Sequence, residues 1–126
     1  MPRTVLVVED EVLVRYDTCD FLRAAGYHVL EASTAQQAID ILQENPAIDL
    51  VFTDVQMPGT MDGIKLSHYI RNRWPPVKLI VVSGMAILEA SSLPDGSRFF
   101  PKPYTNHAIA DAMARMLSSD SKIPNA

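Results

Sequence analysis

Polar side chains follow short apolar runs at four places along the chain. In chain order they are Glu9, Asp10, Asp54, Ser83 and Lys102. If the three carboxylates come close together, they repel one another unless a counter-charge lies between them. A hard divalent cation supplies that charge, and oxygen ligands without His or Cys favour Mg²⁺, with Mn²⁺ as the alternative. Because Mg²⁺ often bridges to phosphate oxygens, this set of residues indicates phosphate chemistry.

The lysine, the serine and the central aspartate could together handle a phosphoryl group. Lys102 adds a positive charge and Ser83 adds a hydroxyl donor, so both can hold phosphoryl oxygens during transfer. A carboxylate can act as the nucleophile in such a transfer and form an aspartyl-phosphate. Asp54 is therefore the predicted phosphoacceptor.

These residues can meet only if the apolar runs are strands of one sheet. The runs at 5–8, 50–52 and 79–82 do not alternate with polar residues, which is typical of strands buried on both faces. Segments with helical spacing lie between them, and weaker strands are expected at 28–31 and 98–100. Strands that alternate with helices predict an α/β, doubly wound fold with a parallel sheet. Ligands of such sheets bind at the carboxyl ends of the strands, where the polar residues lie.

The length of 126 residues favours a single domain. We expect this domain over residues 1–118 and a flexible tail over 119–126, with no room for an output domain. A fourth helix between residues 85 and 96 is expected to be short or poorly formed, because "MAILEASSLPDG" offers only about one and a half turns before a Pro-Asp-Gly turn.

Composition argues against several classes of protein. The net charge is −4 and there is no basic run, which argues against a nucleic-acid surface. No segment approaches the roughly 18–20 apolar residues of a membrane span. Cys19 is the only cysteine, so neither an intrachain disulfide nor a cysteine metal cluster is expected. The start of the chain turns acidic where a signal peptide would stay apolar, so we expect a cytoplasmic protein.

Four motifs resemble those of bacterial response-regulator receiver domains. They are "VLVVEDE", "DLVFTDVQMPGTMDG", "VVSG" and "FFPKP", in the order typical of that family. Each motif alone is a weak signal, but the four together are strong, and the resemblance covers about residues 4–117. It implies a flavodoxin-like (βα)5 fold with five parallel strands in the order 2-1-3-4-5, and a stand-alone receiver of a two-component system.

The resemblance implies a role for each acidic residue of the site. Asp54 would accept phosphate from a histidine kinase or a histidine phosphotransfer protein. Glu9 and Asp10 match the metal-binding acidic pair, with Glu9 in place of the commoner Asp. Asp54 and the backbone carbonyl of Gln56 would complete the protein ligands of the Mg²⁺ ion.

The resemblance also implies a switch. Ser83 matches the switch hydroxyl, Lys102 the lysine that pairs with phosphate, and Phe99 the aromatic switch, where Tyr is frequent. Phosphate on Asp54 would draw the Ser83 hydroxyl inward, and Phe99 would fill the space that Ser83 leaves. The bond between Lys102 and Pro103 is expected to be cis.

The loop after the central strand departs from the commonest pattern. "MPGTMDG" has one more residue between Pro58 and Met61 than the usual form. We expect this difference to alter the loop that lies over the site.

The same residues also allow other interpretations. Taken singly, the acids at 9–11 could form a solvated turn before a helix, Ser83 could cap a helix, Lys102 could be solvated and Phe99 could be a core residue. A nucleotide- or flavin-binding enzyme would need a phosphate cradle after the first strand, but that loop reads "EDE". A hydrolase that uses an aspartyl-phosphate usually has an acid or base two residues past the nucleophile, where this chain has Gln56. A degenerate receiver is disfavoured because the set of site residues is complete.

The favoured hypothesis is a phosphorylation-dependent signalling switch. Such a protein is not an enzyme on external substrates, since it catalyses only its own phosphorylation and some autodephosphorylation. Its expected partners are a histidine kinase or phosphotransfer protein and a downstream protein, with the chain as a monomer or a weak phosphorylation-linked dimer. Diffusible effector, phosphate relay and phosphate sink all remain open.

Overall fold

The computed structural model describes residues 2–59, 61–84 and 92–121. Most of the segment in which we expect a short fourth helix, and the end of the expected tail at 122–126, lie outside the described residues. The last helix continues to Ser121, so its backbone includes the first three residues of the segment expected to be a tail.

Strands and helices alternate along the described chain. The strands are β1 (Thr4–Val8), β2 (His28–Ala32), β3 (Leu50–Asp54), β4 (Lys78–Ser83) and β5 (Arg98–Pro101). The helices are α1 (Val12–Ala24), α2 (Ala35–Glu44), α3 (Gly63–Arg73) and α5 (Asn106–Ser121). Within the described ranges, none of these helices combines the length and the apolar character that crossing a membrane requires.

The strands form one parallel sheet in the order β2-β1-β3-β4-β5, which confirms the predicted fold class and strand order. Val8 lies opposite Thr53 in the pairing of β1 with β3. Glu9 and Asp54, the residues that follow this pair, therefore lie side by side at the carboxyl ends of β1 and β3. The strand order reverses between β1 and β3, and this is the place where open α/β sheets bind ligands.

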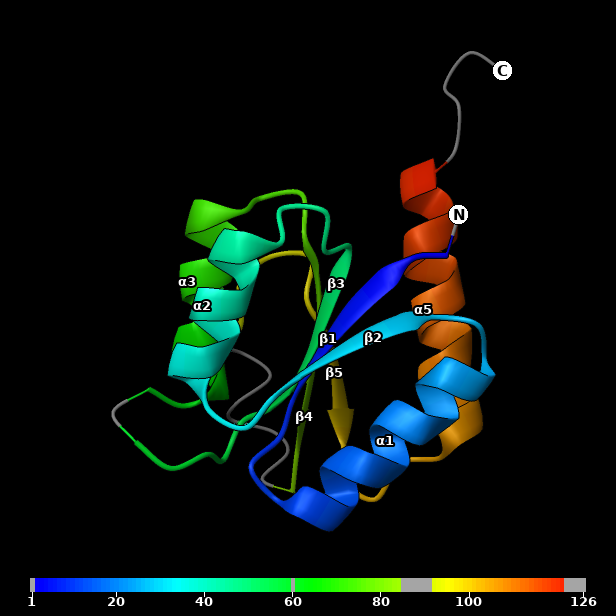
Figure 1. Cartoon of the computed structure of the whole chain (residues 1–126), viewed down its shortest axis with the longest axis horizontal. Coiled ribbons are helices and arrows are strands. Elements are labelled where there is room, and N and C mark those ends of the chain that lie inside the picture. The colour runs from blue at the N-terminus through cyan, green and yellow to red at the C-terminus, as the bar shows by residue number, and fades with distance from the viewer. Residues whose placement is uncertain (1, 60, 85–91, 122–126) are drawn as a thin grey trace.

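Helices cover both faces of the sheet, with α2 and α3 on one side and α1 and α5 on the other (Figure 1). Successive residues of β1 face opposite layers: Leu6 and Val8 join the core under α2 and α3, whereas Val5 and Val7 join the core under α1 and α5. Because both faces are buried, the three central strands β1, β3 and β4 need apolar residues at nearly every position, whereas the edge strands β2 and β5 are partly exposed. This requirement explains the continuous apolar runs of the sequence.

Candidate functional site

Asp54 is the last residue of the central strand β3 and is only 5% exposed. Its Oδ2 accepts a hydrogen bond of 2.7 Å from Nζ of Lys102, and its Oδ1 accepts one of 3.3 Å from the backbone N–H of Gln56. The strand end therefore carries a nearly buried carboxylate whose two oxygens both have donors. A carboxylate held in this way has a fixed orientation, as an attacking nucleophile requires.

Glu9 follows β1 and brings a second buried carboxyl group to Asp54. It is 6% exposed, and its Oε2 accepts a hydrogen bond of 3.0 Å from the backbone N–H of Glu11. Burial, together with the charge of Asp54 and a hydrogen bond shared with Asp54, raises the pKa of Glu9 to about 7, although the Glu11 hydrogen bond and the charge of Lys102 act to lower it. Two acidic groups thus meet at this site, and the positive charge of Lys102 offsets their repulsion only in part.

The raised pKa of Glu9 predicts a pH-dependent cost to stability in metal-free protein. The carboxyl stabilises the folded state below its unfolded pKa of 4.5, and this contribution is lost as the pH rises through about 7. Glu9→Gln removes the ionisation but keeps the shape of the side chain. Relative to this variant, the wild type should lose up to about 3 kcal/mol of unfolding free energy between pH 5 and pH 8.

Urea unfolding at the two pH values, in buffer with a chelator, measures this difference. Glu44→Gln is the matched control, because Glu44 is exposed at the end of α2. Stabilities of wild type and Glu9→Gln that run parallel with pH would contradict the burial argument.

Lys102 lies directly after β5 and is the cation of the site. Burial lowers the pKa of its ammonium group, but the hydrogen bond and charge of Asp54 and the charge of Glu9 outweigh this effect and raise the pKa above its ordinary value. The backbone N–H of Lys102 donates a 2.9 Å hydrogen bond to the carbonyl of Ser83, which ties β5 to the end of β4. The bond between Lys102 and Pro103 is cis, as expected.

Ser83 and Phe99 lie on adjacent strands. Ser83 ends β4 and is fully buried, and Phe99 of β5 is half-buried and pairs with Val81. Val81 and Ser83 are two residues apart on β4 and therefore face the same side of the sheet. Because Phe99 pairs with Val81, it lies on that side too, two residues before the position opposite Ser83. The two residues are therefore neighbours, as a mechanical link between them would require.

Asp10 and Gln56 are the other two predicted ligands of a metal ion. Asp10 is exposed, and across residues 2–59, 61–84 and 92–121 no three His, Cys, Asp or Glu side chains gather closely enough to hold a metal ion. An exposed carboxylate is stabilised by water, whereas a third charge beside Glu9 and Asp54 would be repelled. Gln56 contacts Asp54 through its backbone N–H. The donor set nevertheless suits a hard cation, since Glu9 and Asp54 are buried oxygen ligands with excess negative charge.

Gly63 is a residue of this site that the sequence reasoning missed. It begins α3, and its N–H donates a 2.8 Å hydrogen bond to the carbonyl of Val55. A Cβ at this position would lie 2.7 Å from Cα of Val55 and 2.8 Å from the carbonyl carbon of Asp54, and would overlap the Asp54 carbonyl oxygen. The available signal was a glycine at the first position of a helix, where it is otherwise unfavourable.

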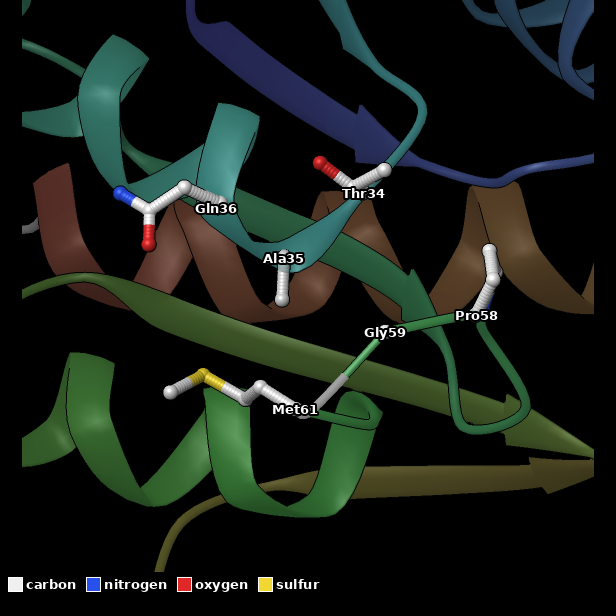
Figure 2. Close-up of a pocket in the computed structure, with 6 residues that line it drawn as sticks. All are labelled: Thr34, Ala35, Gln36, Pro58, Gly59 and Met61. Carbon is white, nitrogen blue, oxygen red and sulfur yellow. The ribbon is translucent and has the colours of Figure 1, made fainter.

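The longer loop after Pro58 borders a pocket of about 470 Å³ beside the start of α2. Figure 2 shows its lining residues, three from the start of α2 and three from the loop: Thr34, Ala35, Gln36, Pro58, Gly59 and Met61. Thr60, within the same loop, lies outside the described residues. None of these lining residues carries a charge, so this pocket differs in chemistry from the site around Asp54.

The family model of the response regulator receiver domain matches residues 5–114. The chain belongs to this family. The receiver domain described here is 39% identical over 118 residues to the sensor kinase CckA of Brucella abortus, and the match covers 90% of this chain but 12% of the kinase. It is 30% identical to the response regulator receiver protein CpdR of the same organism, with 91% of this chain and 97% of CpdR covered.

A solved structure agrees with this assignment. The crystal structure of a response regulator receiver protein from Sinorhizobium medicae WSM419 superposes with a TM-score of 0.88 at 30% identity and covers 95% of this chain and 98% of that one. Receiver domains of two-component response regulators generally bind Mg²⁺ at the phosphorylation site. The receiver family is a phosphoacceptor switch, and the chain's resemblance to it is confirmed.

Proposed function

We propose that this receiver domain accepts a phosphoryl group on Asp54 in a Mg²⁺-dependent reaction and thereby switches its contacts with other proteins. The observation that carries the proposal is the nearly buried Asp54 carboxylate at the end of β3, with Lys102 at 2.7 Å and the Glu9 carboxyl beside it. The donor is a histidine kinase or a histidine phosphotransfer protein. This assignment of the donor is supported by the similarity to CckA, a sensor kinase.

The residues of the chain divide the chemistry among them. One carboxylate oxygen of Asp54 attacks the phosphorus atom, and the bond from phosphorus to the donor's imidazole nitrogen breaks. Lys102 stays protonated, as its raised pKa requires, and neutralises phosphoryl oxygens. The Ser83 hydroxyl donates to another phosphoryl oxygen, and its movement lets Phe99 turn inward.

Four residues would hold the metal ion: Glu9, Asp10 and Asp54 through carboxylates, and Gln56 through its backbone carbonyl. When bound, Mg²⁺ supplies the positive charge that neutralises these carboxylates and the phosphoryl oxygens. The buried acidic pair supports this assignment, because ionising Glu9 beside Asp54 is costly without a cation.

An apolar surface beside the site suits a protein partner. Val12, Leu13 and Tyr16 of α1 are 64%, 75% and 65% exposed. A pocket of about 480 Å³ is lined by Val14 of the same helix and by Lys102, Pro103 and Tyr104. Exposed apolar groups next to a phosphoacceptor favour docking of the protein that donates or receives the phosphate.

Phosphotransfer from purified histidine kinases of the source organism tests the function. We expect transfer from at least one kinase in the presence of Mg²⁺ and none after chelation. Absence of labelling by every kinase and by acetyl phosphate would exclude a phosphoacceptor role.

Lys102→Ala should separate metal binding from switching. The Mg²⁺ affinity should be largely retained, because a lysine ammonium group has no lone pair to ligate a cation and the substitution removes no metal ligand. The aromatic NMR signals of Phe99 should shift on phosphorylation in the wild type and stay in place in the variant. Lys65→Ala, which removes an exposed lysine of α3, is the control. A collapse of Mg²⁺ affinity in Lys102→Ala would show that the role given to the lysine is wrong.

A further inference from the structure

Glu9 is held by its backbone as well as by its carboxyl group. Its N–H donates a 3.0 Å hydrogen bond to the carbonyl of Ala32, at the end of β2. Its own carbonyl lies beyond the β1–β3 pairing, which ends at Val8 and Thr53. Nη1 of Arg15 donates to this carbonyl at 2.7 Å. A backbone carbonyl of so buried a residue needs a donor, and Arg15 provides one.

Arg15 is itself fixed by β2. Its Nε donates to Oε1 of Glu31 at 3.3 Å, and its side chain is 18% exposed. The side chain of Arg15 extends from α1, and its guanidinium group links Glu31 of β2 to the backbone carbonyl of Glu9 in the turn that follows β1. Two contacts on one planar group leave it little freedom to move.

We propose that Arg15 is a positioning residue for the acidic pair, acting by fixing the peptide that joins Glu9 to Asp10. The carbonyl of Glu9 belongs to this planar unit, so holding the carbonyl sets the plane from which both side chains project. The inference rests on the proposed function, because it concerns the ability of these acids to hold Mg²⁺. Arg15 is the fourth residue of α1, near the helix N-terminus, where a positive charge is unfavourable to the helix. Its role in positioning Glu9 gives a reason for an arginine at this place.

Arg23 provides a matched control on the same helix. Its Nη2 donates to Oε2 of Glu31 at 3.2 Å and to the carbonyl of Val29 at 3.1 Å. Arg15→Gln and Arg23→Gln thus each remove one ion pair to Glu31 and one hydrogen bond to a backbone carbonyl. Only the first variant releases the carbonyl of Glu9.

Amide hydrogen exchange in metal-free protein tests the positioning directly. The reporters are the N–H groups of Glu9 and Glu11, which bond to Ala32 and to the Glu9 carboxyl. Arg15→Gln should speed exchange at both amides by about tenfold, as expected for loss of a hydrogen bond to a charged donor. Arg23→Gln should leave both rates unchanged.

Calorimetric titration with Mg²⁺ gives the second readout. Arg15→Gln should weaken the Mg²⁺ affinity by about tenfold or more, which is the usual effect of removing a residue that orients a metal ligand. Arg15→Lys should recover part of this loss, because an ammonium group can still donate to one carbonyl. Arg23→Gln should bind Mg²⁺ like the wild type.

The outcomes separate this inference from the proposed function. Equal effects of Arg15→Gln and Arg23→Gln on exchange and affinity would overturn the positioning role. If the wild type binds no Mg²⁺, the proposed function fails, and the exchange rates alone decide the role of Arg15. If Arg15→Gln does not fold, it is replaced in the comparison by Arg15→Lys. The amides of Glu9 and Glu11 should then exchange faster in Arg15→Lys than in Arg23→Gln, and equal exchange rates in these two variants would overturn the positioning role.

Discussion

Asp54→Asn should abolish Mg²⁺-dependent phosphorylation of this receiver domain by acetyl phosphate. The amide oxygen is a poor nucleophile, and the carboxylate it replaces is the group that Lys102 and the Gln56 amide hold in place. Intact-protein mass spectrometry should show one added phosphoryl group on the wild type and none on the variant. The fold should survive, because the variant loses the ion pair to Lys102 but also relieves the repulsion with Glu9.

Asp62→Asn is the matched control for this loss. Asp62 lies in the same segment and caps α3, where its Oδ1 accepts a 2.9 Å hydrogen bond from the N–H of Lys65. Asn is an equally good cap, so both stability and phosphorylation should be retained. Labelling of Asp54→Asn at the wild-type rate would assign the phosphoacceptor role to another residue.

Gly63→Ala should have the largest effect on stability among substitutions near the site. The added Cβ would overlap the backbone of Asp54 and Val55, which cannot yield as a flexible side chain would. We expect a loss of about 3 kcal/mol of unfolding free energy, the upper end of the usual cost of overpacking and a large part of the stability of a typical domain. Urea unfolding monitored by circular dichroism measures this loss.

The same substitution should slow phosphorylation, because relieving the overlap moves the backbone that carries Asp54. A misplacement of about 1 Å can reduce a rate by about 100-fold. Gly84→Ala is the control: among the described residues, no heavy atom lies within 4 Å of a Cβ at Gly84. A Gly63→Ala protein as stable as Gly84→Ala would mean that α3 does not need its close approach to β3.

Much of the site was predictable because it follows from local pattern. Continuous apolar runs identify strands buried on both faces, and the residue types that end those runs identify the chemistry. The positions of Asp54 and Lys102 at strand ends follow from this reasoning, and so does the strand order once the resemblance to receivers is added. The structure places Nζ of Lys102 2.7 Å from Asp54, although 48 residues separate the two in the chain.

Other features depended on how distant backbone segments meet. Nothing in the acidic run indicates that Glu9 turns inward while Asp10 stays in solvent; the register of β1 beside β3 decides this. The need for glycine at position 63 arises only where α3 crosses the end of β3. The sequence alone determined the strands, the residues at their ends and the class of chemistry, because periodicity and residue type are local properties. The tertiary structure alone decided which carboxylates meet, which glycine is required and which arginine reaches Glu9, because those contacts depend on the packing of segments far apart in the chain.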